Sequence, residues 1–325
     1  MVELPVPWRF PLDPPGLEAH LKADIVMTGN VKKALLFVAL TFFFSWLLAG
    51  LFFYVLGGGS NRLAALAVLI VYMFIPMTMA IIVQKVIYKE PIREPLGISF
   101  RPNRWFLIAW ILPPIIAFAT IGVSLLFPGV TYSPEMAGFY EMFESVLTPE
   151  QLELMKSQAA TFPIHPFWLS LLQGLIGGAT INALAAFGEE LGWRGLLQRE
   201  FGYLGFWKSS VLIGLIWGVW HAPIILQGHN YPQHPQAGVL MMIVWTLLLS
   251  PIFSYVRLKG KSVLAAALIH CSLNGTAGLA VMVTEGGNDL TVGVTGLAGF
   301  IVLAVVNVGL FLYDHLVARE PVVMS

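Results

Sequence analysis

The chain has 325 residues, of which 57% are hydrophobic and 11% are charged, whereas an ordinary soluble domain carries about a quarter charged residues. This composition excludes a water-soluble enzyme and a disordered regulator, and the balance of 18 basic and 18 acidic residues leaves no basic surface for nucleic acid. Cys271 is the single cysteine, which excludes an internal disulfide framework, so the remaining class is an all-α polytopic integral membrane protein that lies in the lipid bilayer.

The N-terminal segment is rich in proline and contains no apolar block of the length that a signal peptide needs. We expect residues 1–33 to form a cytoplasmic tail, in which Trp8 and Phe10 are suited to contact the membrane interface. The prolines of this segment are Pro5, Pro7, Pro11, Pro14 and Pro15.

Eight mainly apolar runs follow, each close to the roughly 20 residues that a helix needs to cross about 30 Å of hydrocarbon. We therefore expect a bundle of eight transmembrane helices over residues 34–314, followed by a cytoplasmic tail over residues 315–325. The runs lie at about residues 34–56, 63–84, 105–127, 167–188, 209–227, 237–256, 262–284 and 291–313.

The basic residues are distributed unequally between the connections of these helices. All but two of the 18 Lys and Arg residues fall in the two tails and in the second, fourth and sixth connections, and the exceptions are Arg62 and Lys156. Because connections rich in Lys and Arg stay on the cytoplasmic side, we expect both termini in the cytoplasm and the protein in the plasma membrane.

The connection over residues 128–166 is long and acidic, and this orientation places it outside the cell. Within it, Thr148-Pro149-Glu150-Gln151 has the pattern of a capping box with proline at the first helical position. We expect a short helical hairpin here, which is either a lid or, more simply, a solvated surface element.

Three of the spans contain polar residues of the kinds that do chemistry, and the first of these spans ends in Glu189 and Glu190. The two carboxylates lie about 100° apart on a helix, and Arg194 follows Glu190 by one turn, in the order that favours pairing. Glu189 is then left without a local cation and is suited to act as a general base. The alternative is a solvated helix end, which this stretch alone does not exclude.

The fifth and seventh spans contain His221 and the pair His270 and Asn274. A single buried histidine usually only satisfies a hydrogen bond of the core, and Pro223 would kink the helix beside His221. His270 and Asn274 lie one turn apart on the same face. They are either hydrogen-bonding contacts between helices or two donors of the kind that an oxyanion hole requires.

Small residues precede the polar residues at helical spacing in all three spans, which predicts that these helices approach closely and that their polar side chains converge. The rise of a helix places His270 about 14 Å past Lys261 and His221 about 20 Å past Lys208. Convergence with Glu189 therefore requires the fourth helix to continue inward past residue 189, or the fifth helix to tilt. The small residues are Gly174, Gly178 and Ala185, Gly214 and Gly218, and Ala266.

The ordered set Glu189-Glu190-x-x-x-Arg194, an aromatic residue followed by x-x-x-His221, and His270-x-x-x-Asn274 resembles the motifs of the type II CAAX prenyl endopeptidases. These enzymes fall within the CAAX protease and bacteriocin-processing family of intramembrane proteases. The resemblance covers about residues 165–285. One departure is Trp217, where the family more often has phenylalanine, and it retains an aromatic side chain at this position.

The resemblance implies an intramembrane glutamate-type endopeptidase whose active site opens toward the cytoplasm and which hydrolyses a membrane-associated protein or peptide. The best-known members remove the last three residues of prenylated CAAX proteins, and some prokaryotic relatives are associated with bacteriocin immunity. By the same resemblance Glu189 would activate water, His221 would position it, His270 and Asn274 would hold the oxyanion, and Glu190 with Arg194 would orient the site.

Three alternatives stay open at the level of the sequence. We expect no cofactor, but Glu189, His221 and His270 are also residue types that ligate zinc, although no HExxH pair is present. The same polar residues would serve a carrier that couples transport to protons or cations. A third possibility is an immunity-type membrane scaffold that keeps the fold without catalysis.

Overall fold

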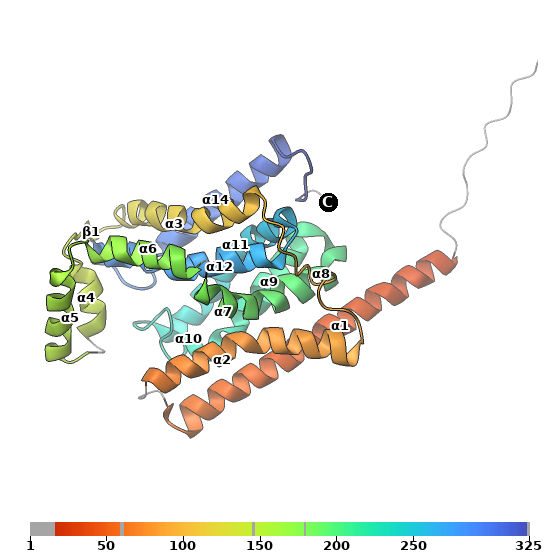
Figure 1. The fold of residues 1–325 in the computed structure, drawn as a ribbon, viewed down its shortest axis with the longest axis horizontal. Coiled ribbons are helices and arrows are strands. Elements are labelled where there is room, and N and C mark those ends of the chain that lie inside the picture. The colour runs from red at the N-terminus through yellow and green to blue at the C-terminus, as the bar shows by residue number, and fades with distance from the viewer. Residues whose placement is uncertain (1–16, 59–61, 145–146, 179, 324–325) are drawn as a thin grey trace, which may run out of the picture.

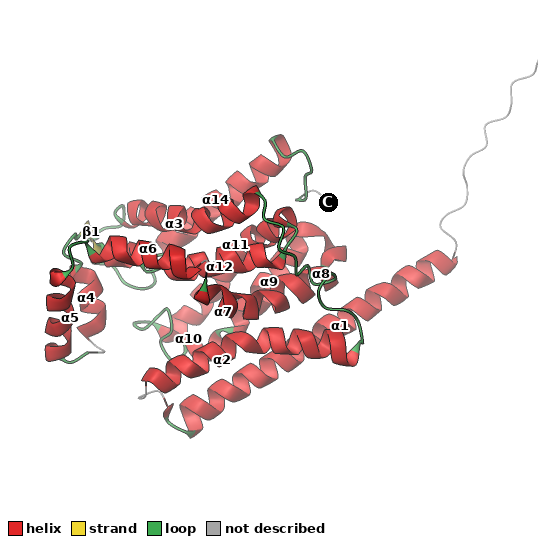
Figure 2. Ribbon diagram, viewed as in Figure 1, coloured by secondary structure: helices red, strands yellow, loops and turns green. Residues whose placement is uncertain are grey.

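The structure is a computed structural model that describes residues 17–58, 62–144, 147–178 and 180–323. Most of these residues are helical, and the strands found among them are β1 (Thr131–Tyr132) and β2 (Thr284–Glu285), which pair antiparallel. Figure 2 shows that most of the described chain is helical, which confirms the predicted all-α class.

Short irregular turns extend several of the helices. The π-helical turns η1 (Leu51–Val55), η3 (Ile82–Ile87) and η4 (Leu191–Leu197) follow α1, α2 and α7, and the 3₁₀ turn η5 (Gly202–Leu204) precedes α9. The helices are α1 (Leu17–Gly50), α2 (Arg62–Ile81), α3 (Arg104–Ser124), α4 (Ala137–Glu144), α5 (Pro149–Thr161), α6 (Pro166–Gly178), α7 (Ile181–Glu190), α8 (Gln198–Glu200), α9 (Gly205–Trp220), α10 (Ala222–Ile225), α11 (Pro235–Gly260), α12 (Val263–Thr276), α13 (Leu279–Met282) and α14 (Leu297–Leu316).

Within the described residues, six helical segments are long and apolar enough to cross a membrane, and a seventh results if α6 and the helix after its 55° bend count as one span. The predicted span over residues 209–227 falls on α9, which has 16 residues and ends at Trp220. Pro223 lacks the N–H that would continue the helical hydrogen bonds, so the chain turns at His221 into α10. The described residues therefore contain six or seven helices of spanning length, against the prediction of about eight, and α9 is shorter than any of them.

The first helix begins earlier than the sequence suggested. α1 starts at Leu17, inside the predicted tail of residues 1–33, whereas residues 1–16, with Trp8 and Phe10, lie outside the described residues. The segment that follows Leu17 contains leucine, alanine, glutamate and lysine, which favour helix, so α1 continues beyond the apolar run and projects from the bundle (Figure 1).

The two central helices of the bundle are α11 and α12. The apolar segments of α11 and α12 are 61% and 67% buried, against 22% and 28% for those of α1 and α2. Figure 1 shows α11 and α12 between α3 and α14 on one side and α1 and α2 on the other. The outer helices α1 and α2 therefore leave most of their apolar surface outside the packed interior of the bundle.

The fourth span is bent, and its second half continues well past Glu189. α7, η4 and α8 form one unbroken helical stretch from Ile181 to Glu200, so Glu189 lies about 16 Å inside the end marked by Glu200. Of the two alternatives that convergence allowed, the structure shows the first, in which the fourth helix continues past residue 189. Glu189 is a buried residue of the bundle interior and does not lie at a solvated helix end.

Glycines allow close approach between several helices. A Cβ atom on Gly174 of α6 would collide with the carbonyl of Gly275 on α12, and one on Gly178 would lie 3.1 Å from the Cα of Ser272. The predicted close contact of the fourth and seventh spans is therefore confirmed. Gly214 and Gly218 of α9 instead meet α11, around Thr246, so the small-residue face of the fifth span packs against the sixth.

The acidic connection forms the predicted helical hairpin at one end of the bundle. Thr148 Oγ1 accepts a hydrogen bond from the Gln151 N–H, and Gln151 Oε1 accepts one from the Thr148 N–H, with Pro149 at the first helical position. The capping box that starts α5 is therefore confirmed. Figure 1 shows α4 and α5 at the far left of the molecule, away from the C-terminus.

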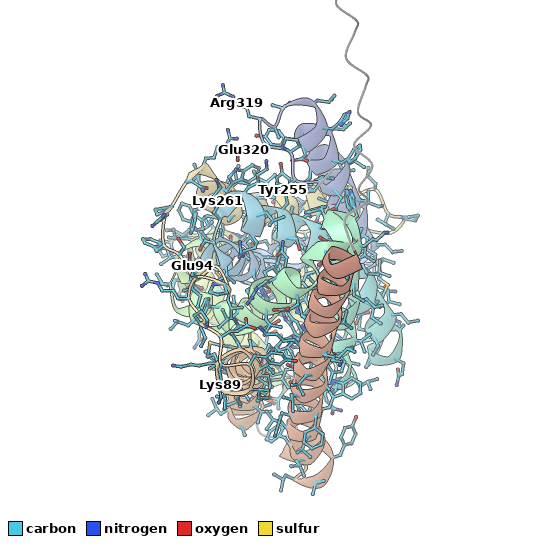
Figure 3. All side chains as sticks on the ribbon, turned by 90° about the vertical axis from the view of Figure 1, so that its right-hand side faces the viewer. Lys89, Glu94, Tyr255, Lys261, Arg319 and Glu320 are labelled. Atoms are coloured by element: carbon cyan, nitrogen blue, oxygen red, sulfur yellow. The ribbon has the colours of Figure 1, made fainter. Side chains whose placement is uncertain are left out.

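The connections rich in Lys and Arg gather at the opposite end. Buried Lys33 of α1 forms ion pairs with Glu90 and with Glu200, at 2.9 and 3.3 Å, and Arg199 lies 3.1 Å from Glu90. Figure 3, which views this end, shows Lys89, Glu94, Lys261 and Arg319 there. Ion pairs between three separate connections therefore hold the basic end together.

Glu90 provides a pH-dependent part of this network. Burial alone would raise the pKa of Glu90, but the hydrogen bonds and positive charges of Lys33 and Arg199 hold the pKa below its usual range. A carboxylate with a lowered pKa stabilises the folded state above its unfolded pKa of about 4.3, and this stabilisation is lost as the pH falls through the folded-state pKa.

Glu90→Gln should therefore lower the thermal unfolding temperature in detergent at pH 7 by roughly 2 °C, because Glu90 is partly exposed and Lys33 keeps Glu200 as a second partner. The difference from the wild type should shrink as the pH is lowered below the usual pKa of a glutamate. The matched control is Glu94→Gln, which changes an exposed carboxylate of the same connection. If Glu90→Gln lowered the unfolding temperature by the same amount from neutral to acidic pH, the proposed role of the Glu90 carboxylate would be contradicted.

Candidate active site

Three helices that are distant in the sequence bring most of the predicted polar residues into the interior of the bundle, whereas Asn274 of α12 is exposed. Glu189 and Glu190 lie at the end of α7, His221 directly follows α9, and His270 lies on α12. All four side chains are buried, with exposed fractions between 0 and 7%. The structure therefore brings together ionisable groups that in lipid-facing positions would be very costly.

Glu190 is the centre of a buried charge cluster. Arg194 Nη1 donates a hydrogen bond to Glu190 Oε1 at 3.1 Å, and His270 Nδ1 lies 2.8 Å from the same oxygen. A carboxylate oxygen accepts hydrogen bonds, so Nδ1 of His270 carries the proton and Nε2 is the ring nitrogen left for other partners. The pairing of Glu190 with Arg194, which the spacing predicted, thus extends to a third residue on another helix.

Arg194 is completely buried between two aromatic rings. Its guanidinium carbon lies 4.7 Å from the centre of the Trp217 ring and 5.1 Å from that of Phe253. Cation–π contacts of this kind partly replace the water that the guanidinium loses on burial. Trp217, the aromatic residue one turn before His221, therefore belongs to the charge cluster and also lines the site.

Glu189 has a hydrogen-bond donor that the sequence analysis missed. Trp217 Nε1 donates to Glu189 Oε2 at 2.8 Å, and both groups are buried. The sequence signal for this contact was the presence of tryptophan at a position where the family more often has phenylalanine, since only tryptophan carries an N–H on its ring. The indole N–H therefore engages Oε2 of Glu189, and Oε1 is the other oxygen of the same carboxylate.

The orientation of His221 follows from its contact with the main chain. His221 Nδ1 lies 2.8 Å from the carbonyl oxygen of Trp217, one turn earlier on α9. A carbonyl only accepts hydrogen bonds, so Nδ1 is the protonated nitrogen and Nε2 is left for a ligand or for water. The His221 ring also packs edge-on against Trp220, with ring centres 4.7 Å apart.

The first two spans support this side of the site, although they contain no motif. Tyr72 of α2 donates its hydroxyl hydrogen to the Trp220 carbonyl at 2.6 Å, and Trp220 Nε1 donates to Ser45 Oγ of α1 at 2.9 Å. Trp46 of α1 also donates to the Trp220 carbonyl, at 3.2 Å. These contacts fix the end of α9, where His221 begins the turn into α10.

A cavity of about 260 Å³ adjoins these residues. Glu189, His221, His270 and Asn274 all contribute to its lining, so the predicted convergence is observed. The volume is several times the share of about 30 Å³ that one water molecule occupies in the liquid. Further lining residues are Leu69, Tyr72, Met73, Trp217, Trp220, Ile224, His229, Asn230, Met242, Trp245, Ala277 and Thr295.

The loop residues of this lining lie at the end opposite the basic connections. α9 begins and α11 ends at the basic end, so the connection between them, with His229 and Asn230, lies at the other end, as does Thr295 before α14. If the basic connections are cytoplasmic, the cavity reaches toward the outer face. The cytoplasmic opening of the site, like the orientation, stays a prediction.

The zinc alternative does not fit the side-chain arrangement. Among the described residues, no three His, Cys, Asp or Glu side chains lie close enough together to hold a metal ion. Nδ1 of each histidine is turned toward another acceptor, so Nε2 is the ring nitrogen that each histidine could offer to a ligand. Even so, the site has no set of three side chains placed to hold a metal ion within the described part of the chain.

Comparison with known proteins agrees with the resemblance of the motifs. The family model described as "Type II CAAX prenyl endopeptidase Rce1-like" matches residues 167–276, which include all of the motif residues. A curated relative, CAAX prenyl protease 2 of Methanococcus maripaludis, is 32% identical over 104 residues. The match spans 28% of this chain and 36% of the relative. The comparisons thus support the family resemblance over the part of the chain that builds the site.

The buried charge cluster makes a prediction about stability. Arg194→Met should destabilise the protein by about 3 kcal/mol, because it removes one partner of a buried carboxylate and leaves Glu190 without its guanidinium. The double variant Glu190→Gln/Arg194→Met should recover part of this loss, since it also removes the uncompensated charge. Denaturant unfolding in detergent micelles measures both, and a double variant less stable than Arg194→Met would contradict the pairing.

Proposed function

We propose that the protein is an intramembrane endopeptidase that hydrolyses a peptide bond with water activated by Glu189. The observation that best supports this proposal is that Glu189, His221, His270 and Asn274 line one cavity inside the bundle. The family match over residues 167–276 and the relative named CAAX prenyl protease 2 support the same class of reaction. The proposed substrate is a membrane-associated protein or peptide that undergoes CAAX-type or related C-terminal processing.

The proposed reaction begins with proton transfer to Glu189. Trp217 engages Oε2, so Oε1 is the oxygen that accepts a proton from water while the water oxygen attacks the carbonyl carbon of the substrate. His221 Nε2 accepts a hydrogen bond from the same water and fixes its direction of attack. A buried carboxylate is suited to this step because water competes little for its lone pairs there.

The tetrahedral intermediate places negative charge on the former carbonyl oxygen. We assign its stabilisation to the side-chain N–H of Asn274 and to the Nε2–H of His270, which enters the reaction already protonated on both ring nitrogens. The Glu190 carboxylate, which already accepts a hydrogen bond from His270 Nδ1, balances the positive charge that this second proton brings. The C–N bond then breaks as Glu189 gives its proton to the leaving nitrogen. This step releases the acid and amine products and restores the Glu189 carboxylate.

Glu189→Gln tests this assignment most simply, because it keeps the shape of the side chain and removes the base. The enzyme in lipid vesicles would be given membrane-anchored peptides, among them a farnesylated CAAX peptide and the same peptide without its lipid. We expect cleavage of at least one peptide by the wild type and a loss of at least about 1000-fold in Glu189→Gln.

Glu153→Gln is the matched control, since Glu153 is an exposed glutamate on α5, and it should retain wild-type activity. An unchanged thermal unfolding temperature would show that Glu189→Gln still folds. Undiminished cleavage by Glu189→Gln would contradict the proposed role. The ratio of cleavage of the two CAAX peptides would show whether the prenyl group contributes to recognition.

Chelation tests the metal-free character of the proposed reaction. The side-chain arrangement offers no cluster of three ligands among the described residues, so saturating EDTA should leave the cleavage rate unchanged. Activity would be measured on the same peptides before and after chelation, followed by addition of Zn²⁺. Loss of activity that Zn²⁺ restores would contradict a reaction in which Glu189 alone activates the water.

A further inference from the structure

Trp217 contacts both groups that are proposed to handle the attacking water. Its indole N–H donates to Glu189 Oε2 at 2.8 Å, and its main-chain carbonyl lies 2.8 Å from His221 Nδ1. One residue therefore sets the orientation of the carboxylate through its side chain and that of the imidazole through its backbone. The sequence motifs indicate only an aromatic ring at position 217 and no hydrogen bond from it.

The Trp217 ring is held firmly in place by its neighbours. It is 1% exposed, and the centres of the His270 and Phe253 rings lie 5.3 and 5.7 Å from its own. The Arg194 guanidinium lies over the same ring at 4.7 Å. A ring packed on these sides has little freedom to change rotamer, so its N–H presents a fixed direction to Glu189.

We propose that Trp217 is a positioning residue that orients the Glu189 carboxylate through its indole N–H, and this inference rests on the proposed function. With Oε2 held by the indole, Oε1 points consistently toward the place where water must lie. A rotation of the carboxylate would move the accepting oxygen, and errors of about 1 Å in such groups cost on the order of 100-fold in rate.

Trp217→Phe separates this contribution from packing. Phenylalanine keeps an aromatic ring between Arg194 and His270 and keeps the main-chain carbonyl that His221 contacts, but it has no N–H. We expect kcat on the best peptide of the panel to fall about 10- to 100-fold, less than for Glu189→Gln, with KM within twofold of the wild type. A packing defect alone would instead lower the unfolding temperature and change both constants.

Trp110→Phe is the control for the loss of an indole N–H elsewhere in the bundle, where the tryptophan is partly buried. Trp110 of α3 donates to the Leu175 carbonyl at 2.9 Å and is not part of the cavity lining, so its variant should keep wild-type kcat. If Trp217→Phe is too unstable to assay, 3-benzothienylalanine at position 217 replaces the N–H by sulfur with nearly the same ring shape. The same fall in kcat is expected from this replacement.

The outcomes distinguish this inference from the proposed function. Wild-type kcat in Trp217→Phe or in the benzothienylalanine protein, together with an inactive Glu189→Gln, would overturn the role of Trp217 alone. Full activity of Glu189→Gln would overturn the proposed function, whatever the behaviour of position 217. A fall in kcat that is confined to position 217 and absent from Trp110→Phe would support the inference.

Discussion

The site depends on one buried electrostatic constraint, the sharing of the Glu190 carboxylate between Arg194 and His270. Three ionisable groups with almost no exposure are stable inside a membrane bundle only if each is paired. The pairing connects the end of α7 to the middle of α12, and it determines which nitrogen of His270 faces the cavity. Glu189, the neighbour of Glu190, is thereby placed on the cavity side of the same helix end.

Aromatic residues extend this constraint to the rest of the site. Trp217 packs on Arg194 and donates to Glu189, so the charge cluster and the proposed base share one ring. Tyr72 and Ser45 hold Trp220 from α2 and α1, which fixes the helix end that leads into His221. The two outermost spans, although they carry no motif, thus contribute to the position of a proposed catalytic histidine.

Local patterns predicted those features that depend on neighbouring residues. The helical class follows from apolar run length, and the Glu190–Arg194 pair and the capping box at Thr148 follow from spacing of three or four residues. The break after Trp220 was harder to predict, because Pro223 allows either a kink or an end. Contacts such as Tyr72 to Trp220 join residues 148 positions apart, and no periodicity in a single sequence records them.

In the proposed reaction Glu189, His221, His270 and Asn274 surround one reacting carbonyl group. The most direct measurement is an electron cryomicroscopy structure of the protein with a bound phosphinate peptide, whose tetrahedral phosphorus resembles the intermediate. We expect one phosphinate oxygen about 3 Å from the Asn274 amide and His270 Nε2, and the other beside Glu189. A phosphinate bound outside the cavity, with the cavity filled by lipid or side chains, would contradict this arrangement.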